Sequence, residues 1–273
     1  MFGTRNSESR CSKRAKPPRS HIFKGEVHGK LEALPANDVI RQLFERKSVR
    51  AFTDEPVTRE EELQILEAAI QAPTAGNEQL YSIVVVHDQT KKEALAASCD
   101  NQPFIAKASL VLAFCADVRR WYRGFCLAGA SPREPGVGDF LLAVEDTMIA
   151  AQNSVVAAQS LGIGSCYIGD ILERCEEQAR ILSCPRWVVP ASVVVYGRPA
   201  TGQVRRAKPL RWPVESVVFE DAFVDPEDSE LVELLRAKQA DLAAFCARKW
   251  NSDFSREMTS SAARILKGFA SEA

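Results

Sequence analysis

Positively charged residues gather at two places in the sequence where they could hold an anion. Arg46-Lys47-Ser48-Val49-Arg50 puts three cations and a hydroxyl within five residues. Such a group could hold a phosphate and the edge of an anionic ring through charge-assisted hydrogen bonds. It could equally be a set of cations that complement the C-terminus of a helix. A second basic group follows much later in the chain and contains Arg205, Arg206, Lys208 and Arg211.

Two further segments have residue types suited to ligand contact. The glycines of Gly162-Ile163-Gly164-Ser165 precede Tyr167-Ile168-Gly169, and glycine lets a backbone approach a flat ligand closely. The alternative is that these glycines only end a helix and turn the chain. The segment Pro73–Gln79 is rich in turn-forming residues and predicts a loop.

The eight cysteines and three histidines do not predict a metal site, since they show neither a Cys-x-x-Cys pair nor metal-ligand spacing. Several cysteines lie within apolar runs, which favours reduced core thiols in a cytoplasmic protein without a secretory signal. A redox-sensing or catalytic cysteine is the alternative. The net charge of −1 provides no global field for nucleic acid or acidic lipid. No apolar run is long enough to span a membrane.

A long helix is predicted over residues 140–161, which contain no proline or glycine before Gly162. It would be roughly 33 Å long. Apolar residues fall on nearly every side, while Glu145, Asp146, Gln152 and Asn153 argue against a bilayer. We therefore expect a buried helix, which could also contact a partner subunit.

The helix lies among further elements that would position the basic and glycine-rich segments. Asn37 is a suitable N-cap for a first helix, and Thr58 and Glu61 form a capping box for a second. Apolar runs predict buried strands at 82–87, 109–115 and 188–196. Helices are expected at 91–98, at 173–182 and, with an amphipathic pattern, from Asp225 onward. The aromatic-bearing segment 117–137 is interpreted as the cover of a pocket or as a surface helix.

Six ordered motifs resemble the nitroreductase family of FMN-dependent oxidoreductases, over about residues 37–225. They are Arg-Lys-Ser-Val-Arg-Ala-Phe (46–52), Ala-Pro-Thr-Ala-Gly-Asn-Glu-Gln (72–79), Ile-Ala-Ala-Gln-Asn (149–153), Leu-Gly-Ile-Gly-Ser (161–165), Tyr-Ile-Gly (167–169) and Tyr-Gly-Arg-Pro-Ala (196–200). The resemblance implies an α+β fold in which helices flank a central, mostly antiparallel sheet. It also implies a homodimer with FMN between the subunits and the long helix at their interface.

The resemblance divides the chain into three parts. Residues 1–35 are a basic extension, interpreted as disordered, with a targeting role or a basic contact arm as alternatives. Residues 36–225 are the FMN-binding domain. Residues 226–273 resemble the C-terminal helical extension of the nitroreductase and flavin-reductase branch, and would pack on the body or on the partner subunit.

Site residues follow from the resemblance position by position. Cations and a hydroxyl would hold the phosphate, with Arg50 near the N1/O2 edge of the flavin. Lys208 and Arg211 are spaced one residue wider than the family's Lys-x-Arg, so Arg211 and Arg206 depart from the family pattern. Asn77 and Gln79 would touch the ring from the partner subunit. The implied cofactor-binding set is Arg46, Lys47, Ser48, Arg50, Asn77, Gln79, Gln102, Tyr167, Ile168, Gly169, Lys208 and Arg211.

The implied reaction is a ping-pong relay in which NADPH or NADH reduces FMN at N5 and a nitroaromatic, quinone or similar acceptor is then reduced. No dedicated acid, base or nucleophile is required, because the protein supplies position and electrostatics. Thr74-Ala75 and Leu80-Tyr81 depart from the family pattern near the ring. A specialised flavoenzyme acting by ring oxidation or dehalogenation, and a non-catalytic flavin-binding protein, are the alternatives. Four arginines could serve a 2′-phosphate of NADPH: Arg123, Arg133, Arg205 and Arg206.

Overall fold

The computed structural model describes residues 37–270, which fall into two compact units. The larger unit comprises residues 37–209 and 243–270, and the smaller unit comprises 210–242. The predicted N-terminal extension, residues 1–35, lies outside the described residues. No helix in the described part of the chain has the length and apolarity needed to cross a membrane.

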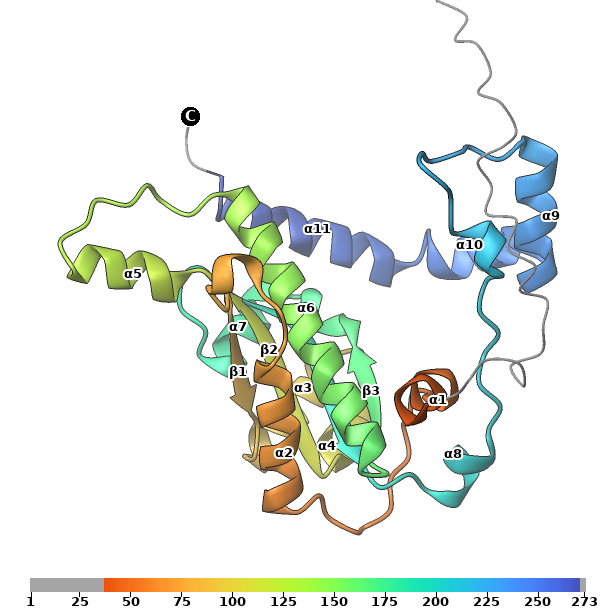
Figure 1. Ribbon diagram of the computed structural model, residues 1–273, viewed down its shortest axis with the longest axis horizontal. Helices are drawn as coiled ribbons and strands as arrows, with labels where there is room; N and C mark the ends of the chain where they lie inside the picture. Colours follow the sequence, from red (N-terminus) through yellow and green to blue (C-terminus); the bar gives the residue numbers. More distant parts are fainter. Residues whose placement is uncertain (1–36, 271–273) are drawn as a thin grey trace, which may run out of the picture. The chain divides into compact units, whose positions relative to one another are not determined.

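A four-stranded antiparallel sheet forms the centre of the larger unit (Figure 1), with the strand order β1-β2-β4-β3. The predicted α+β fold with an antiparallel sheet is confirmed. Three of the four strands lie where the apolar runs predicted them. The strands are β1 (Tyr81–Val85), β2 (Leu110–Asp117), β3 (Gly164–Ile168) and β4 (Val188–Gly197).

Helices cover both faces of this sheet, so β2 is buried at every position and apolar from Leu110 to Ala116. Leu112 and Phe114 pack with α2 (Arg59–Ile70) and α6 (Val137–Ser160) on one face. Val111 and Ala113 pack on the other face, against a second group of helices (Figure 1). That group consists of α3 (Gln89–Ser98), α4 (Pro103–Lys107) and α7 (Cys175–Leu182).

The long helix α6 has the predicted position and the predicted end. Its last turn closes on Gly162, which has a φ of 71°, and Ile163 N donates to Ala158 O (2.9 Å). This left-handed cap is the conformation in which glycine has no Cβ penalty. One side of α6 packs on the sheet, while Leu141, Met148 and Ile149 remain exposed.

The predicted helix starts are confirmed where local capping residues define them. The Asn37 side chain accepts a hydrogen bond from Ile40 N at the start of α1 (Asp38–Glu45). Thr58 and Glu61 form both bonds of the capping box that begins α2. The other short elements of the larger unit are η2 (Ala75–Asn77), α5 (Arg119–Leu127), η3 (Gly169–Leu172) and α8 (Thr201–Arg205).

Two sequence interpretations were incomplete, and a third had two alternatives. Residues 164–168 form a strand, which their glycine-spaced pattern did not predict. Their strand conformation comes from pairing with β4 along their whole length. Residues 119–127 form a helix. The single C-terminal helix is instead three helices, since Gln239 is extended and Ser252 begins a new N-cap. They are α9 (Asp228–Lys238), α10 (Leu242–Lys249) and α11 (Asp253–Lys267).

The smaller unit contains η4 (Val214–Ser216) and α9. Two aromatic contacts stabilise it: Lys238 Nζ lies 4.0 Å from the centre of the Trp212 ring, and the rings of Phe219 and Phe223 meet edge to face. Within the larger unit, α11 packs against α7, where Cys175 N donates to Ser261 Oγ (3.0 Å).

Candidate functional site

The first basic segment, residues 46–50, leaves the end of α1 and runs beside β3, an edge strand of the sheet. Val49 N donates a hydrogen bond to Ser165 O (2.9 Å), and Ser48 forms a parallel bridge with Ser165. Gly164 permits this approach, because a Cβ at that position would lie 2.7 Å from Val49 Cγ2. The segment is therefore fixed against the sheet edge.

The second basic segment lies directly against the first. We call residues 199–208 the strap. Lys47 Nζ donates to the backbone carbonyl oxygens of Val204 (2.7 Å) and Arg206. In the opposite direction, the Arg206 guanidinium donates to Ser48 O. Lys47 and Val204 are 157 positions apart in the sequence. Cations from two distant segments therefore join those segments to each other.

Further hydrogen bonds join the strap to α1 and to the first segment. Lys208 Nζ donates to Leu43 O (3.0 Å) and Phe44 O (2.6 Å), which belong to the last turn of α1. Lys208 therefore also complements the negative end of this helix. Arg50 N donates to Gln203 Oε1 (3.3 Å). We call Arg46, Lys47, Arg50, Arg206 and Lys208 the basic cluster.

The charges of the basic cluster act on β3. Burial raises the pKa of the Cys166 thiol, while the positive charges of Arg50, Arg46 and Arg206 and a hydrogen bond with Ser48 oppose that rise. Because these side chains come from both basic segments, their charges converge on one short stretch of strand. An electropositive edge of this kind is suited to an anionic ligand.

Arg46 has donors that the protein does not use. Its guanidinium lies 5.8 Å from the centre of the Tyr167 ring. Its Nε and Nη2 atoms are buried and find no hydrogen-bond partner among the described residues. Burial raises the pKa of Tyr167 to about 12, against the opposing charge of Arg46. Since a buried charged donor without a partner is costly, Arg46 fits an anion such as a phosphate.

The end of β3 offers backbone next to the cluster. Ile168 is buried, whereas Gly169 begins η3 and is exposed. A Cβ at Gly169 would meet no atom within 4 Å. A flat ligand could therefore approach the backbone at this position without a clash.

The predicted residues Asn77 and Gln79 are not brought to the basic cluster. The turn that carries them is bound by Asp146 of α6, through hydrogen bonds from both of its ends. Arg46 instead lies near Val156, ten residues further along the same helix. Ten helical residues span about 15 Å. One subunit therefore presents the two sets at separate places.

Two further predicted residues, Gln102 and Arg211, are not among the residues of the basic cluster. The Gln102 side chain donates to Cys99 O (2.9 Å), at the start of α4. Arg211 belongs to the smaller unit. The Arg206 guanidinium, from the second basic segment, donates to Ser48 O of the first segment. The sequence named Arg206 but could not rank it, because its spacing matches no family motif.

A hollow of about 300 Å³ lies beside α5. Trp121, Tyr122 and Phe125 of this helix line it together with Leu80 and Glu78. Segment 117–137 therefore satisfies both interpretations made from the sequence: it contains a helix, and its aromatic residues border a pocket. Among the described residues, no group of three histidine, cysteine or acidic side chains could hold a metal ion.

Two buried carboxyl groups near these segments were not predicted as site residues. Asp146 is 3% exposed and binds the turn that carries Asn77. Glu173 follows η3, is 4% exposed, and its Oε1 atom has no hydrogen-bond partner among the described residues. The sequence pattern marked Asp146 only as a polar interruption of an apolar helix. For Glu173, the only available signal was the acidic character of its segment.

Comparison with known proteins extends over most of the chain. The sequence model described as Nitroreductase family matches residues 43–198. The "FMN reductase [NAD(P)H]" of Bacillus subtilis is 31% identical over 229 residues, which are 83% of this chain and 90% of that protein. The "Oxygen-insensitive NADPH nitroreductase" of Salmonella typhimurium is 34% identical over 194 residues, 71% of this chain and 77% of that protein.

A solved structure agrees with these sequence matches. The NfrA2 protein of B. megaterium superposes with a TM-score of 0.69 and 30% sequence identity, over 85% of this chain and 92% of that chain. The family match covers both the first basic segment and β3, the two parts that the fold brings together. On this evidence, the chain belongs to the nitroreductase family.

Proposed function

We propose that the protein is an FMN-dependent oxidoreductase that takes electrons from NADPH or NADH and passes them to a nitroaromatic compound, a quinone or a similar small acceptor. The observation that carries this proposal is the meeting of two distant basic segments at the edge of β3. There, Arg46 has two buried donors without a partner among the described residues. The order of the motifs and the names of the relatives agree with it.

The residues at this edge fit the charge and shape of FMN. Arg46, Lys47, Ser48 and Lys208 would hold the phosphate, and Arg50 would face the pyrimidine side of the ring. Ile168 and Gly169 would offer backbone to the ring, as would Tyr167 beside them. When bound, FMN supplies the N5 atom that accepts and returns a hydride. A cation beside the ring stabilises the negative charge gained on reduction.

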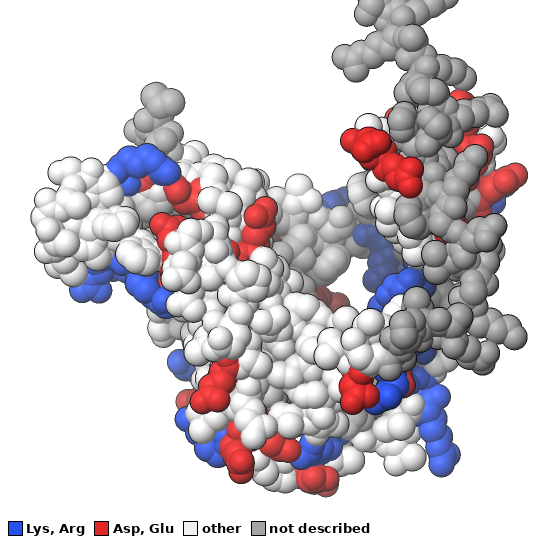
Figure 2. Space-filling model, in the orientation of Figure 1, with Lys and Arg blue, Asp and Glu red and all other residues white. Residues whose placement is uncertain are grey.

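We propose that a homodimer completes each site. Asn77 and Gln79 lie about 15 Å along α6 from the cations of the same subunit, so a second copy would bring them to the ring. Most of the surface over α6 that is seen in Figure 2 carries no charged group. Leu141, Met148 and Ile149 of this helix are exposed. An exposed apolar stripe of this kind marks a protein interface. Gln102 and Arg211 are assigned to the site from the family motif alone.

The remaining assignments are also proposals. We assign the FMN-binding domain to residues 36–225 and a helical extension to residues 226–273. We infer a cytoplasmic location because the seven cysteines of the described residues are all free thiols, as expected in a reducing compartment.

The visible spectrum of the purified protein tests the proposal. We expect a yellow protein whose absorbance bleaches on anaerobic addition of NADPH or NADH and recovers when a quinone or nitroarene is added. If the protein is yellow but neither nicotinamide bleaches it, a specialised flavoenzyme becomes the better explanation. A colourless protein that cannot be reconstituted with FMN contradicts the proposed function and leaves only the fold.

A further inference from the structure

The turn formed by residues 74–80, which we call the 74–80 turn, is held in a strained conformation. Gly76, Asn77 and Gln79 have positive φ angles of 57°, 58° and 51°. Residues other than glycine rarely adopt this region, and each costs on the order of 1 kcal/mol. Such a conformation persists only where its surroundings hold it. The turn therefore depends on contacts from outside it.

Asp146 supplies two of these contacts. Its Oδ1 atom accepts a hydrogen bond from Ala75 N (3.0 Å), and its Oδ2 atom accepts one from Leu80 N (3.2 Å). The two oxygens of one carboxylate thus bind the first and last parts of the turn. Asp146 is 3% exposed, and hydrogen bonds to a buried carboxylate are stronger than those between neutral groups. Asp146 lies 66 positions from Leu80 in the sequence, so a residue far along the chain closes the turn.

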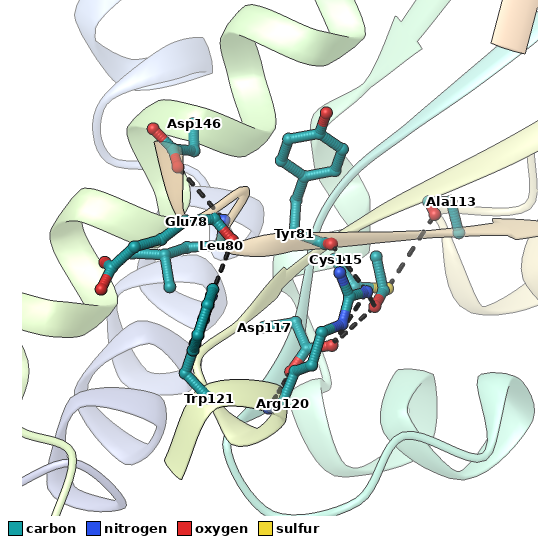
Figure 3. Close-up of polar contacts among 10 residues, drawn as sticks. Glu78, Leu80, Tyr81, Ala113, Cys115, Asp117, Arg120, Trp121 and Asp146 are labelled. Carbon is teal, nitrogen blue, oxygen red and sulfur yellow. Dashed lines mark hydrogen bonds and ion pairs between the residues drawn. The ribbon is translucent and has the colours of Figure 1, made fainter. Parts of the chain in front are cut away.

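Two further contacts link the turn to its neighbours. Gln79 N donates to Thr74 Oγ1 (2.8 Å), which closes the turn internally. Trp121 Nε1 of α5 donates to Glu78 O (2.7 Å). Figure 3 shows Asp146 and Trp121 binding the chain at Leu80 and Glu78. Trp121 also lines the hollow beside α5, so this side chain both anchors the turn and forms part of the wall of that hollow.

We propose that Asp146 is a positioning residue of the flavin site. Its carboxylate holds the 74–80 turn in the one shape that presents Asn77 outward, where Asn77 is exposed. Gln79 is half-buried in the same shape, and its Nε2 atom donates to Ile70 O (3.4 Å). Asp146 does not touch the cofactor itself. It lies on α6 next to the exposed apolar stripe, so the helix that would carry the dimer interface also fixes the turn offered to the partner. This inference rests on the proposed function.

The substitution Asp146→Asn tests it. The amide keeps the size of the side chain but replaces one acceptor oxygen with an N–H donor that would face a backbone N–H. We expect FMN to dissociate about tenfold more readily, the change that follows from losing one charge-assisted hydrogen bond. The visible absorption bands of bound FMN should also shift, because the ring would lose its contacts with Asn77 and Gln79. Hydrogen exchange of the amides at 75–80 should become faster.

Asp117→Asn is the matched control. Asp117 is 7% exposed and binds Ser82 Oγ (2.6 Å) and Arg120 N (3.1 Å), at the junction of β1 and α5. Figure 3 shows Asp117 beside Arg120 and apart from Asp146, outside the 74–80 turn. The same chemical change there should lower stability while FMN affinity and the flavin spectrum stay as in the wild type. If both variants weaken FMN equally, the effect of Asp146 is general destabilisation and the inference is wrong.

The remaining outcomes separate the inference from the proposed function. Wild-type affinity and spectrum in Asp146→Asn overturn the inference and leave the proposed function intact. Failure of the wild-type protein to bind FMN overturns both. If Asp146→Asn does not fold, Thr74→Val replaces it, because it removes the acceptor of Gln79 N without changing side-chain size. That variant should weaken FMN about threefold, and an unchanged affinity contradicts the inference.

Discussion

Residues 164–173, which we call the β3 strip, have surroundings of opposite charge at their two ends. The charged groups at the two ends also differ in their hydrogen-bond partners. At the β3 end, the cations Arg46, Arg50 and Arg206 surround Cys166. At the end of η3, Glu173 is surrounded by the acidic residues Asp170, Glu257 and Asp100. Lys47 and Arg206 donate to backbone carbonyls, whereas Glu173 Oε1 has no partner among the described residues.

The comparison shows two ways in which the protein arranges ionisable groups. At the first end, backbone carbonyl acceptors hold Lys47 and Arg206 at the sheet edge, an arrangement suited to an anionic ligand. The second end suppresses its charge. Burial, followed by the charges of Asp170, Glu257 and Asp100, raises the pKa of Glu173 to about 7. Ile168 and Gly169, proposed to contact the flavin, lie between these two ends.

The largest expected effect concerns the acidic end. Glu173 has an ordinary value of 4.5 and a folded-state pKa of about 7, so the folded protein binds its proton more tightly than the unfolded chain. The free energy of unfolding should therefore fall as pH rises from about 4.5 to 7, and then stay level, with a total loss on the order of 3 kcal/mol. Urea unfolding of the wild type and of Glu173→Gln measures this loss of unfolding free energy. The pH range of about 4 to 8 spans both pKa values.

In Glu173→Gln this part of the pH dependence should disappear, which makes the variant more stable than the wild type above pH 7. Glu257→Gln should preserve the dependence but move it to lower pH, because one of the charges that raise the pKa of Glu173 is gone. An identical pH dependence in the wild type and Glu173→Gln would show that Glu173 does not hold its proton in the folded state.

The basic end could be predicted from the sequence and the acidic end could not. Arg46 to Arg50 form a cluster within five residues, so their chemistry is visible without a fold. The pKa of Glu173 depends on Asp100 and Glu257, which only the packing of α11 and of the chain after α3 brings near it. Asp146 is similar, since its partners lie 66 and 71 positions away.

The fold itself was predictable to the extent that local patterns define it. The continuous apolar run of β2 and the caps of α1, α2 and α6 were sufficient to place those elements. Strand β3 could not be placed from its local pattern. Gly164 permits the close approach of Val49 to this strand, but a glycine weakens the strand pattern. Its strand conformation comes from pairing with β4.

The next largest effect tests how the basic end is built. In Gly164→Ala the new Cβ would overlap Val49, which lies 2.7 Å away at Cγ2, and would also meet Pro199 of the strap at 3.0 Å. We expect a loss of stability of about 1–3 kcal/mol and weaker FMN binding, because both basic segments must shift. Thermal unfolding and FMN titration measure the two effects.

Gly138→Ala is the control for this substitution. A Cβ at Gly138 would meet nothing within 4 Å, and the residue lies in the first turn of α6. It should be neutral or slightly stabilising, by up to about 1 kcal/mol. Equal losses in the two variants would mean that the close approach of Val49 to β3 has no special importance.

A smaller effect is expected from the charge of Arg50 alone. Arg50→Ala should weaken FMN retention about tenfold, as loss of one charge-assisted contact would, and should slow reduction of the flavin. Arg180→Ala removes an exposed arginine of α7 and should change neither property. An Arg50→Ala protein that stays fully flavinated and active contradicts the assignment of the first basic segment.

The smallest effect separates the two parts of Tyr167. Its hydroxyl donates to Gln152 Oε1 (3.2 Å), whereas its ring lies under the Arg46 guanidinium. Because burial raises the pKa of Tyr167 to about 12, the hydroxyl stays protonated near neutral pH and is not a source of protons. Tyr167→Phe should therefore change FMN affinity by less than about threefold and leave the pH profile of NADPH oxidation unaltered. Tyr167→Leu removes the ring under Arg46, a contact worth about 0.5–1 kcal/mol, and should weaken FMN more than Tyr167→Phe does. The reverse order would mean that the hydroxyl, and not the ring, positions Arg46 at the basic end of the β3 strip.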